Sequence, residues 1–151
     1  IEKVLDKVRR VFLTHAQDKK LEFKVVKSEK KLPLIRADEL KFYQSVASLV
    51  DNAIKYTQKG FVRVSTEVDK KNVRIIVEDS GVGISKESLE TLFLKFSRGV
   101  DNSRLYTEGA GFGLYISKSL VELQGGKVYA ESEGIGKGSR FIVEMPIHKC
   151  V

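Results

Sequence analysis

The chain has 151 residues, of which 42% are hydrophobic and 31% charged, as expected for one globular domain. This composition excludes a collagen-like or wholly disordered chain, and neither a signal peptide nor an apolar run near the ~20 residues that span a bilayer is visible. The net charge of +7 is concentrated in residues 1–31, which hold ten Lys and Arg against five Asp and Glu. Because acidic residues interleave there, the pattern favours a solvated helix face over a nucleic-acid or membrane contact.

The first part of the chain predicts two helices with two short strands between them. Apolar residues recur at helical spacing over 2–17. β-Branched and aromatic residues over 21–27 predict a strand, and 33–37 fits a second, short strand with a proline near its start. Asp38 is a favourable N-cap for the next helix, which continues to about Lys55.

The middle of the chain predicts a hairpin, a short helix and a long polar loop. Strands over 61–68 and 73–78 are separated by a polar turn and therefore pair antiparallel. A helix over 85–96 follows, with Ser85 as its cap. Residues 97–109 are polar and aperiodic, and this segment is long enough to be a functional loop or lid.

The last part of the chain predicts one more helix and two strands. The helix opens at Gly109–Gly113 and reaches about Leu123, where Gly125–Gly126 stop it. Strands over 127–133 and 139–146 follow, and no repeat, linker or low-complexity segment is present. The chain is therefore expected to be a single α+β domain with helices on one face of a mixed sheet.

Two glycine-rich segments, 79–84 and 109–113, are the first candidates for chemistry. Taken alone, each is a weak signal, because turn glycines explain both. The second segment reads Gly-x-Gly-x-Gly rather than the Gly-x-Gly-x-x-Gly of dinucleotide folds, and the Gly-Lys-Ser/Thr of a phosphate loop does not occur.

The combination of four segments is far more specific, because in order and spacing they resemble the boxes of the catalytic domain of sensor histidine kinases. They are Leu49–Thr57 (asparagine box), Asp79–Ile84 (first glycine box), Leu92–Gly99 (phenylalanine box) and Glu108–Leu114 (second glycine box). The resemblance covers essentially the whole chain and extends to the gyrase, heat-shock chaperone and histidine kinase ATPase superfamily. It implies a two-layer α/β sandwich with helices on one face of a mixed sheet, and ATP bound between the helices under a lid at about 97–108.

The asparagine box suits the phosphate end of Mg·ATP. Lys55 and Tyr56 lie three and four positions after Asn52, so the three share a helix face. An Asn carbonyl is a hard oxygen ligand suited to Mg²⁺, and Lys55 supplies a point charge to the phosphates. The resemblance implies Asn52 as the metal ligand and Asn52 with Lys55 as the catalytic pair. Without the other three boxes, Asn52 would be interpreted as a polar residue with a structural role.

The first glycine box suits the base. The Asp79 carboxylate is a pure acceptor and can take a hydrogen bond from the exocyclic amine of adenine, which selects ATP over GTP. Gly81 and Gly83 let the backbone approach the base. Taken alone, Asp79 would be read as a turn-forming residue.

The remaining expected contacts come from the lid and the second glycine box. Lys95 and Arg98, and more weakly Arg104, are candidates to neutralise phosphate charge, with solvated surface charge as the alternative. Backbone N–H groups at a helix start suit a triphosphate, whereas Phe93 and Phe96 are read as anchors of the lid. The complete set of expected nucleotide contacts is Asn52, Lys55, Tyr56, Asp79, Gly81, Gly83, Ile84, Lys95, Phe96, Arg98, Gly109, Gly111, Phe112, Gly113 and Leu114.

A phosphoacceptor is missing from the pattern. Kinases of this family carry the acceptor histidine next to an acidic residue on a separate dimerisation domain, whereas His15 is followed by Ala16. His148 follows the last predicted strand and is read as a surface residue. His148 and the single Cys150 are too few for a zinc site, and one cysteine forms no internal disulfide.

Two positions depart from related patterns. Ser48 stands where gyrase-type ATPases carry the Glu that activates water and where the kinases often carry Asn. A serine is a poor general base at neutral pH, so hydrolysis should be feeble. Ala110 stands where a Thr or Ser is more usual, which puts one lid hydroxyl contact in doubt.

These features predict a protein-histidine kinase catalytic domain over 1–151, without its dimerisation domain and inactive in autophosphorylation alone. Its expected ligands are ATP and Mg²⁺. Its expected partners are the histidine-bearing domain and a response regulator, with no nucleic acid. The fragment is expected to be monomeric and cytoplasmic, whether or not the parent is membrane-anchored. An ATP-binding regulatory module or anti-sigma-type serine kinase of the same fold is the alternative, and a basic interaction domain without nucleotide is a third reading.

Overall fold

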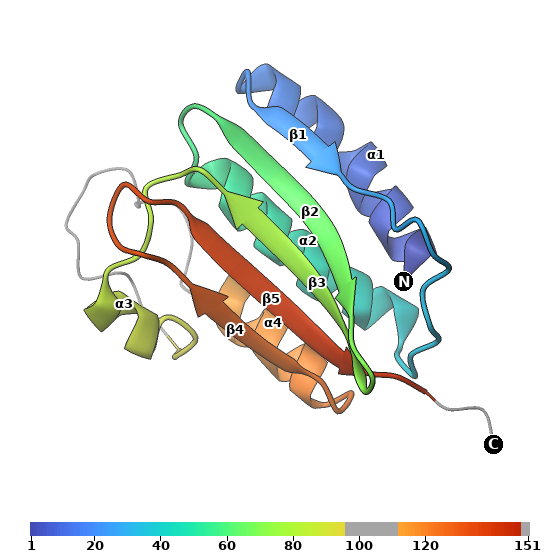
Figure 1. Cartoon of the computed structure of the whole chain (residues 1–151). Coiled ribbons are helices and arrows are strands. Elements are labelled where there is room, and N and C mark those ends of the chain that lie inside the picture. Colours follow the sequence, from blue (N-terminus) through green and yellow to red (C-terminus); the bar gives the residue numbers. More distant parts are fainter. Residues whose placement is uncertain (96–111, 149–151) are drawn as a thin grey trace.

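A computed structural model describes residues 1–95 and 112–148 of the chain. The elements, in chain order, are α1 (Glu2–Asp18), β1 (Glu22–Val25), α2 (Glu39–Lys55), β2 (Phe61–Val68), β3 (Asn72–Asp79), α3 (Lys86–Thr91), α4 (Gly113–Glu122), β4 (Lys127–Glu131) and β5 (Ser139–Pro146). Figure 1 shows α1, α2 and α4 layered on one face of the sheet, while α3 stands beside one end of β4. The expected α+β sandwich is confirmed.

The sheet is mixed, in the order β1-β2-β3-β5-β4. β1 runs parallel to β2, whereas the other neighbouring pairs are antiparallel. In this register Asp79, the last residue of β3, stands opposite Ser139, the first residue of β5. The last residue of β3 and the first residue of β5 therefore lie side by side at the same end of the sheet (Figure 1).

The core lies between the helices and one face of the sheet. Alternate residues of each strand point inward, and the helices contribute the residues that recur at helical spacing. The fully buried set includes Val8 of α1, Val46, Leu49 and Val50 of α2, Val62 and Val64 of β2, and Val77 and Val143 of β3 and β5. Each such side chain contributes on the order of 1.5–3 kcal/mol by leaving water.

The α2 helix begins at its predicted cap residue, Asp38. The Asp38 carboxylate accepts a hydrogen bond from the Lys41 N–H (2.9 Å).

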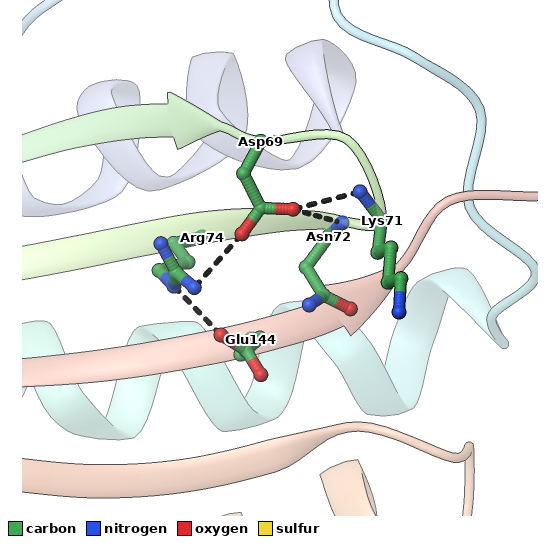
Figure 2. A network of polar contacts seen from close by, with 5 residues as sticks. All are labelled: Asp69, Lys71, Asn72, Arg74 and Glu144. Carbon is green, nitrogen blue, oxygen red and sulfur yellow. Dashed lines mark hydrogen bonds and ion pairs between the residues drawn. The ribbon is translucent and has the colours of Figure 1, made fainter.

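The opposite face of the sheet carries charged pairs. Figure 2 shows a network in which the Asp69 carboxylate accepts hydrogen bonds from the Lys71 and Asn72 N–H groups of its own turn. The Arg74 guanidinium lies 2.9 Å from Asp69 and 2.6 Å from Glu144 of β5. The network ties the β2–β3 turn to β5.

Four predicted elements differ from the structure. The strand expected over 21–27 is shorter and spans Glu22–Val25. The expected strand over 33–37 is wrong: the segment makes one bridge, between Ile35 and Ile147. Pro33 has no N–H to donate and the chain turns into α2 at Asp38, so pairing cannot extend. The helix expected over 85–96 ends at Thr91, and the strand expected over 127–133 ends at Glu131.

In the ranges 1–95 and 112–148, no helix has both the length and the apolar character needed to cross a membrane.

Candidate nucleotide site

Three predicted site residues project from the C-terminal half of α2. Ala53 and Ile54 are buried on the core side, which leaves Asn52, Lys55 and Tyr56 half-buried on the other side. The Lys55 ammonium lies 5.8 Å from the centre of the Tyr56 ring. Burial, with a smaller contribution from the negative charge of Asp51, raises the pKa of the Tyr56 hydroxyl.

The carboxylate of Asp79 is buried at the end of β3 and is held by two donors. Asp79 is only 6% exposed. One oxygen accepts a hydrogen bond from the Ser139 hydroxyl (2.6 Å) and the other from the Gly81 N–H (2.8 Å). Burial raises the pKa of Asp79, while these two hydrogen bonds oppose the rise. The result is an oriented acceptor at the edge of the sheet.

Gly81 allows the loop after Asp79 to pass close to α2. A Cβ at Gly81 would come within 2.8 Å of the Asp79 carboxylate and of the Thr57 hydroxyl, and closer still to the Tyr56 carbonyl. The next residue, Val82, donates its N–H to that carbonyl (3.2 Å). The loop is therefore attached directly to the end of α2.

The other side of the same loop is attached to the β4–β5 turn. Gly83 has φ of +72°, and a Cβ there would overlap the carbonyl oxygen of Gly134. The Gly136 N–H donates to the Val82 carbonyl (2.7 Å), and the Ile84 N–H donates to the Ser132 hydroxyl (3.0 Å). These bonds explain why β4 ends at Glu131, because Ser132 turns toward the loop.

The start of α4 lies beside α2. A Cβ at Gly113 would lie 3.3 Å from the Ser48 hydroxyl, one helical turn before Asn52. Phe112 is the N-cap residue and makes no side-chain cap hydrogen bond, so the first N–H groups of α4 are not capped by it. Leu114 packs against the core. The structure thus brings Phe112, Gly113 and Leu114 next to the helix that carries Asn52.

The structure describes some of the residues that precede the predicted lid. The Lys95 ammonium lies 5.0 Å from the centre of the Tyr115 ring on α4. Phe93 packs edge to face on Phe141, with ring centres 6.3 Å apart, in agreement with its expected role as an anchor. The remaining predicted residues of the lid and second glycine box lie outside the described residues: Phe96, Arg98, Gly99, Arg104, Gly109, Ala110 and Gly111.

Ser139 is the site residue whose role sequence reasoning missed. The position after Gly138 was visible in the sequence, but its bond to Asp79 depends on the pairing of β3 with β5. Thr57 was also missed, because its position beside Gly81 depends on how the end of α2 packs against the loop after β3.

The donor set fits a magnesium nucleotide. Among the described residues no three His, Cys, Asp or Glu side chains gather as a metal site of their own. Asn52 instead offers a single amide oxygen, which matches the needs of Mg²⁺, because this ion keeps most of its waters and bridges substrate phosphates.

Comparisons with known proteins agree with this geometry. The family model for histidine kinase-, DNA gyrase B- and HSP90-like ATPases matches residues 37–149. Histidine protein kinase 1 of Candida albicans is 41% identical over 119 residues, which are 76% of this chain and 5% of that kinase.

Two solved structures are similar along the whole chain. Full-length ShkA in complex with AMPPNP has a TM-score of 0.85 and 30% identity, and covers 100% of this chain and 31% of its own. The nucleotide-free catalytic domain of the histidine kinase ThkA has a TM-score of 0.81 and 27% identity, and covers 97% of this chain and 93% of its own. The chain therefore spans a small part of the Candida kinase and nearly all of the isolated ThkA domain.

Proposed function

The chain belongs to the family of histidine kinase-, DNA gyrase B- and HSP90-like ATPases, and on that premise we propose that it is the catalytic domain of a two-component sensor kinase. In this proposal it binds ATP with Mg²⁺ and donates the γ-phosphate to a histidine on a separate dimerisation domain. A response regulator then receives the phosphoryl group from that histidine.

The observation that carries the proposal is the geometry of Asp79. Its carboxylate is buried and oriented by hydrogen bonds from Ser139 and Gly81, and the Gly81 backbone packs closely against it. A carboxylate fixed in this orientation suits the exocyclic amine of adenine, because guanine has no donor at that position. We therefore assign base selection to Asp79.

The phosphate end of the site is assigned to α2 and α4. The Asn52 amide oxygen would hold Mg²⁺, whose positive charge offsets the charge that develops on the phosphates. Lys55 adds a second positive charge one turn of helix away. The N–H groups at the start of α4 form the positive end of its helix dipole, which favours the binding of an anion.

The position of Ser48 favours transfer to a protein over hydrolysis of ATP. Its hydroxyl lies beside Gly113, where a carboxylate base would have to stand to activate water. A serine hydroxyl binds its proton too tightly for this role at neutral pH. In this proposal, the attacking group is therefore an imidazole supplied by the partner domain.

Neither described histidine has the features of that acceptor. The His15 ring packs edge to face on Phe12, with centres 5.9 Å apart. His148 lines a surface groove with Asp38, at the N-terminal end of α2. That end lies about 25 Å from the Asn52 end, given the rise of 1.5 Å per residue.

An isothermal titration with AMPPNP and Mg²⁺ tests the proposal, since the chain has no Trp to report binding. We expect binding of AMPPNP but not of a GTP analogue, and a loss of roughly 10- to 100-fold in affinity for Asp79→Asn. Asn52→Ala should abolish the contribution of Mg²⁺.

Two controls separate the site from general damage. Glu78→Gln removes a carboxylate from the neighbouring residue, which faces Arg63 at 3.6 Å on the other side of β3, and should bind normally. Far-UV circular dichroism should show that all variants are folded. Failure of the wild-type chain to bind AMPPNP would refute the proposed function, whereas normal binding by Asp79→Asn would refute only the site assignment.

A further inference from the structure

The last turn of α2 carries the predicted phosphate contacts, and its backbone carbonyls need partners. Intrahelical bonding ends there, so these carbonyls must be satisfied by other groups. The backbone carbonyl of Asn52 accepts a hydrogen bond from the Tyr56 N–H (2.9 Å). The backbone carbonyl of Ala53 accepts one from the Thr57 hydroxyl (2.7 Å). The Tyr56 carbonyl accepts from the Val82 N–H (3.2 Å).

The two remaining carbonyls of this turn are bound by a lysine from a distant part of the chain. The Lys19 ammonium donates to the carbonyl oxygens of Ile54 (2.6 Å) and Lys55 (3.1 Å). These groups form the negative end of the α2 dipole, where a positive charge is favourable. Burial lowers the pKa of Lys19, which agrees with an ammonium that is partly withdrawn from water.

The end of α1 directs Lys19 toward α2. Lys20 adopts a left-handed conformation with φ of 56°. Its N–H donates to the Gln17 carbonyl (2.8 Å), and the Leu21 N–H donates to the Ala16 carbonyl (2.9 Å). This is the pairing of a Schellman motif, which ends α1 with a defined geometry. Lys19 is therefore placed by backbone structure rather than by its flexible side chain alone.

We infer that Lys19 is a positioning residue for the nucleotide site: by binding the Ile54 and Lys55 carbonyls, it holds the turn of α2 from which Lys55 and Tyr56 project. The inference rests on the proposed function, because it assigns these two side chains to nucleotide binding. It also links the position of α1 to the geometry of the phosphate end of the site.

The phosphate end and the base end should respond differently to loss of this lysine. Asp79 is held by Ser139, and the loop after it is held chiefly by the β4–β5 turn, which Lys19 does not contact. One further bond joins this loop to the end of α2, from the Val82 N–H to the Tyr56 carbonyl. Loss of the ammonium should therefore weaken contacts to the triphosphate much more than contacts to adenosine. A purely structural role would lower both affinities together.

Isothermal titrations of AMPPNP with Mg²⁺ and of adenosine test the inference on the full chain. For Lys19→Met, which keeps the aliphatic stem, we expect AMPPNP affinity to fall about tenfold and adenosine affinity to change less than about twofold. Lys19→Arg, which keeps the donors, should restore most of the AMPPNP affinity. Lys20→Met removes the same charge from the exposed neighbour and should bind like the wild type.

The outcomes separate this inference from the proposed function. If the wild-type chain does not bind AMPPNP, the proposed function fails first. If the wild type binds and Lys19→Met binds equally well, only the role of Lys19 is overturned. An equal loss for both ligands also overturns it in favour of a structural role. If Lys19→Met does not fold, Lys19→Gln, which is shorter and has no positive charge, is measured in the same way, and the same selective loss of AMPPNP affinity is expected.

Discussion

Substitution of Ser139 by alanine tests the central polar pair of the site. The Ser139 hydroxyl lies 2.6 Å from the Asp79 carboxylate, and the two residues are 9% and 6% exposed. A hydrogen bond to a charged group contributes about 1.5–3 kcal/mol, and alanine leaves the buried carboxylate with one donor fewer. For a domain of this size, the melting temperature should fall by roughly 5–10 °C at neutral pH.

The same substitution has a predictable pH dependence. The pKa of Asp79 is raised by burial, so ionisation of this group opposes folding at neutral pH and the opposition fades on acidification. The Ser139 hydroxyl limits that rise, so its removal raises the pKa of Asp79 further. The stability difference between Ser139→Ala and the wild type should therefore be largest at neutral pH. It should narrow as the pH falls through the pKa of Asp79.

Urea unfolding followed by far-UV circular dichroism at several pH values measures this difference. Ser139→Thr keeps a hydroxyl and serves as the matched control. In an Asp79→Asn background, Ser139→Ala should cost only about 0.5–1.5 kcal/mol, because the bond is then between neutral groups. A loss that does not change between neutral and acidic pH, or that is equal in both backgrounds, would contradict the reasoning.

Two further predictions concern a glycine and a turn. Gly83→Ala should destabilise the chain and weaken AMPPNP binding more than Gly136→Ala does, because both have positive φ but only the first meets a backbone atom, the Gly134 oxygen. In each variant, an alanine at positive φ is expected to cost about 1–2 kcal/mol of conformational strain. If the two variants have equal free energies of unfolding, the overlap with the Gly134 oxygen is unimportant. Backbone N–H donors of its own turn lower the pKa of Asp69, so the wild type should be more stable than Asp69→Asn at neutral pH. That advantage should disappear on acidification below pH ~4, and its persistence in acid unfolding curves would contradict the assignment.

Several elements of the fold follow from local sequence alone. The helical period of apolar residues and the Asp38 cap predict α2 nearly to the residue, since both signals act within a few turns of one helix. The strands β2, β3 and β5 are likewise predicted by alternation and turns. The four boxes point to the site residues and to the family.

The predictions of secondary structure that are wrong concern segments whose structure depends on contacts with distant parts of the chain. Residues 33–37 have the composition of a strand, yet a strand needs a partner edge, and only Ile35 meets Ile147. The helix expected to reach residue 96 ends at Thr91. The lid expected over about 97–108 lies entirely outside the described residues.

The connections that shape the site were decided by tertiary structure. Asp79 and Ser139 are 60 residues apart, and their bond depends on the β3–β5 register. Lys19 reaches the end of α2 across 35 residues because α1 and α2 pack side by side. Sequence determined which groups are present, since helix period, caps and motif spacing act between near neighbours. Only the packed chain determined which of these groups meet, because register and helix packing depend on the whole core at once.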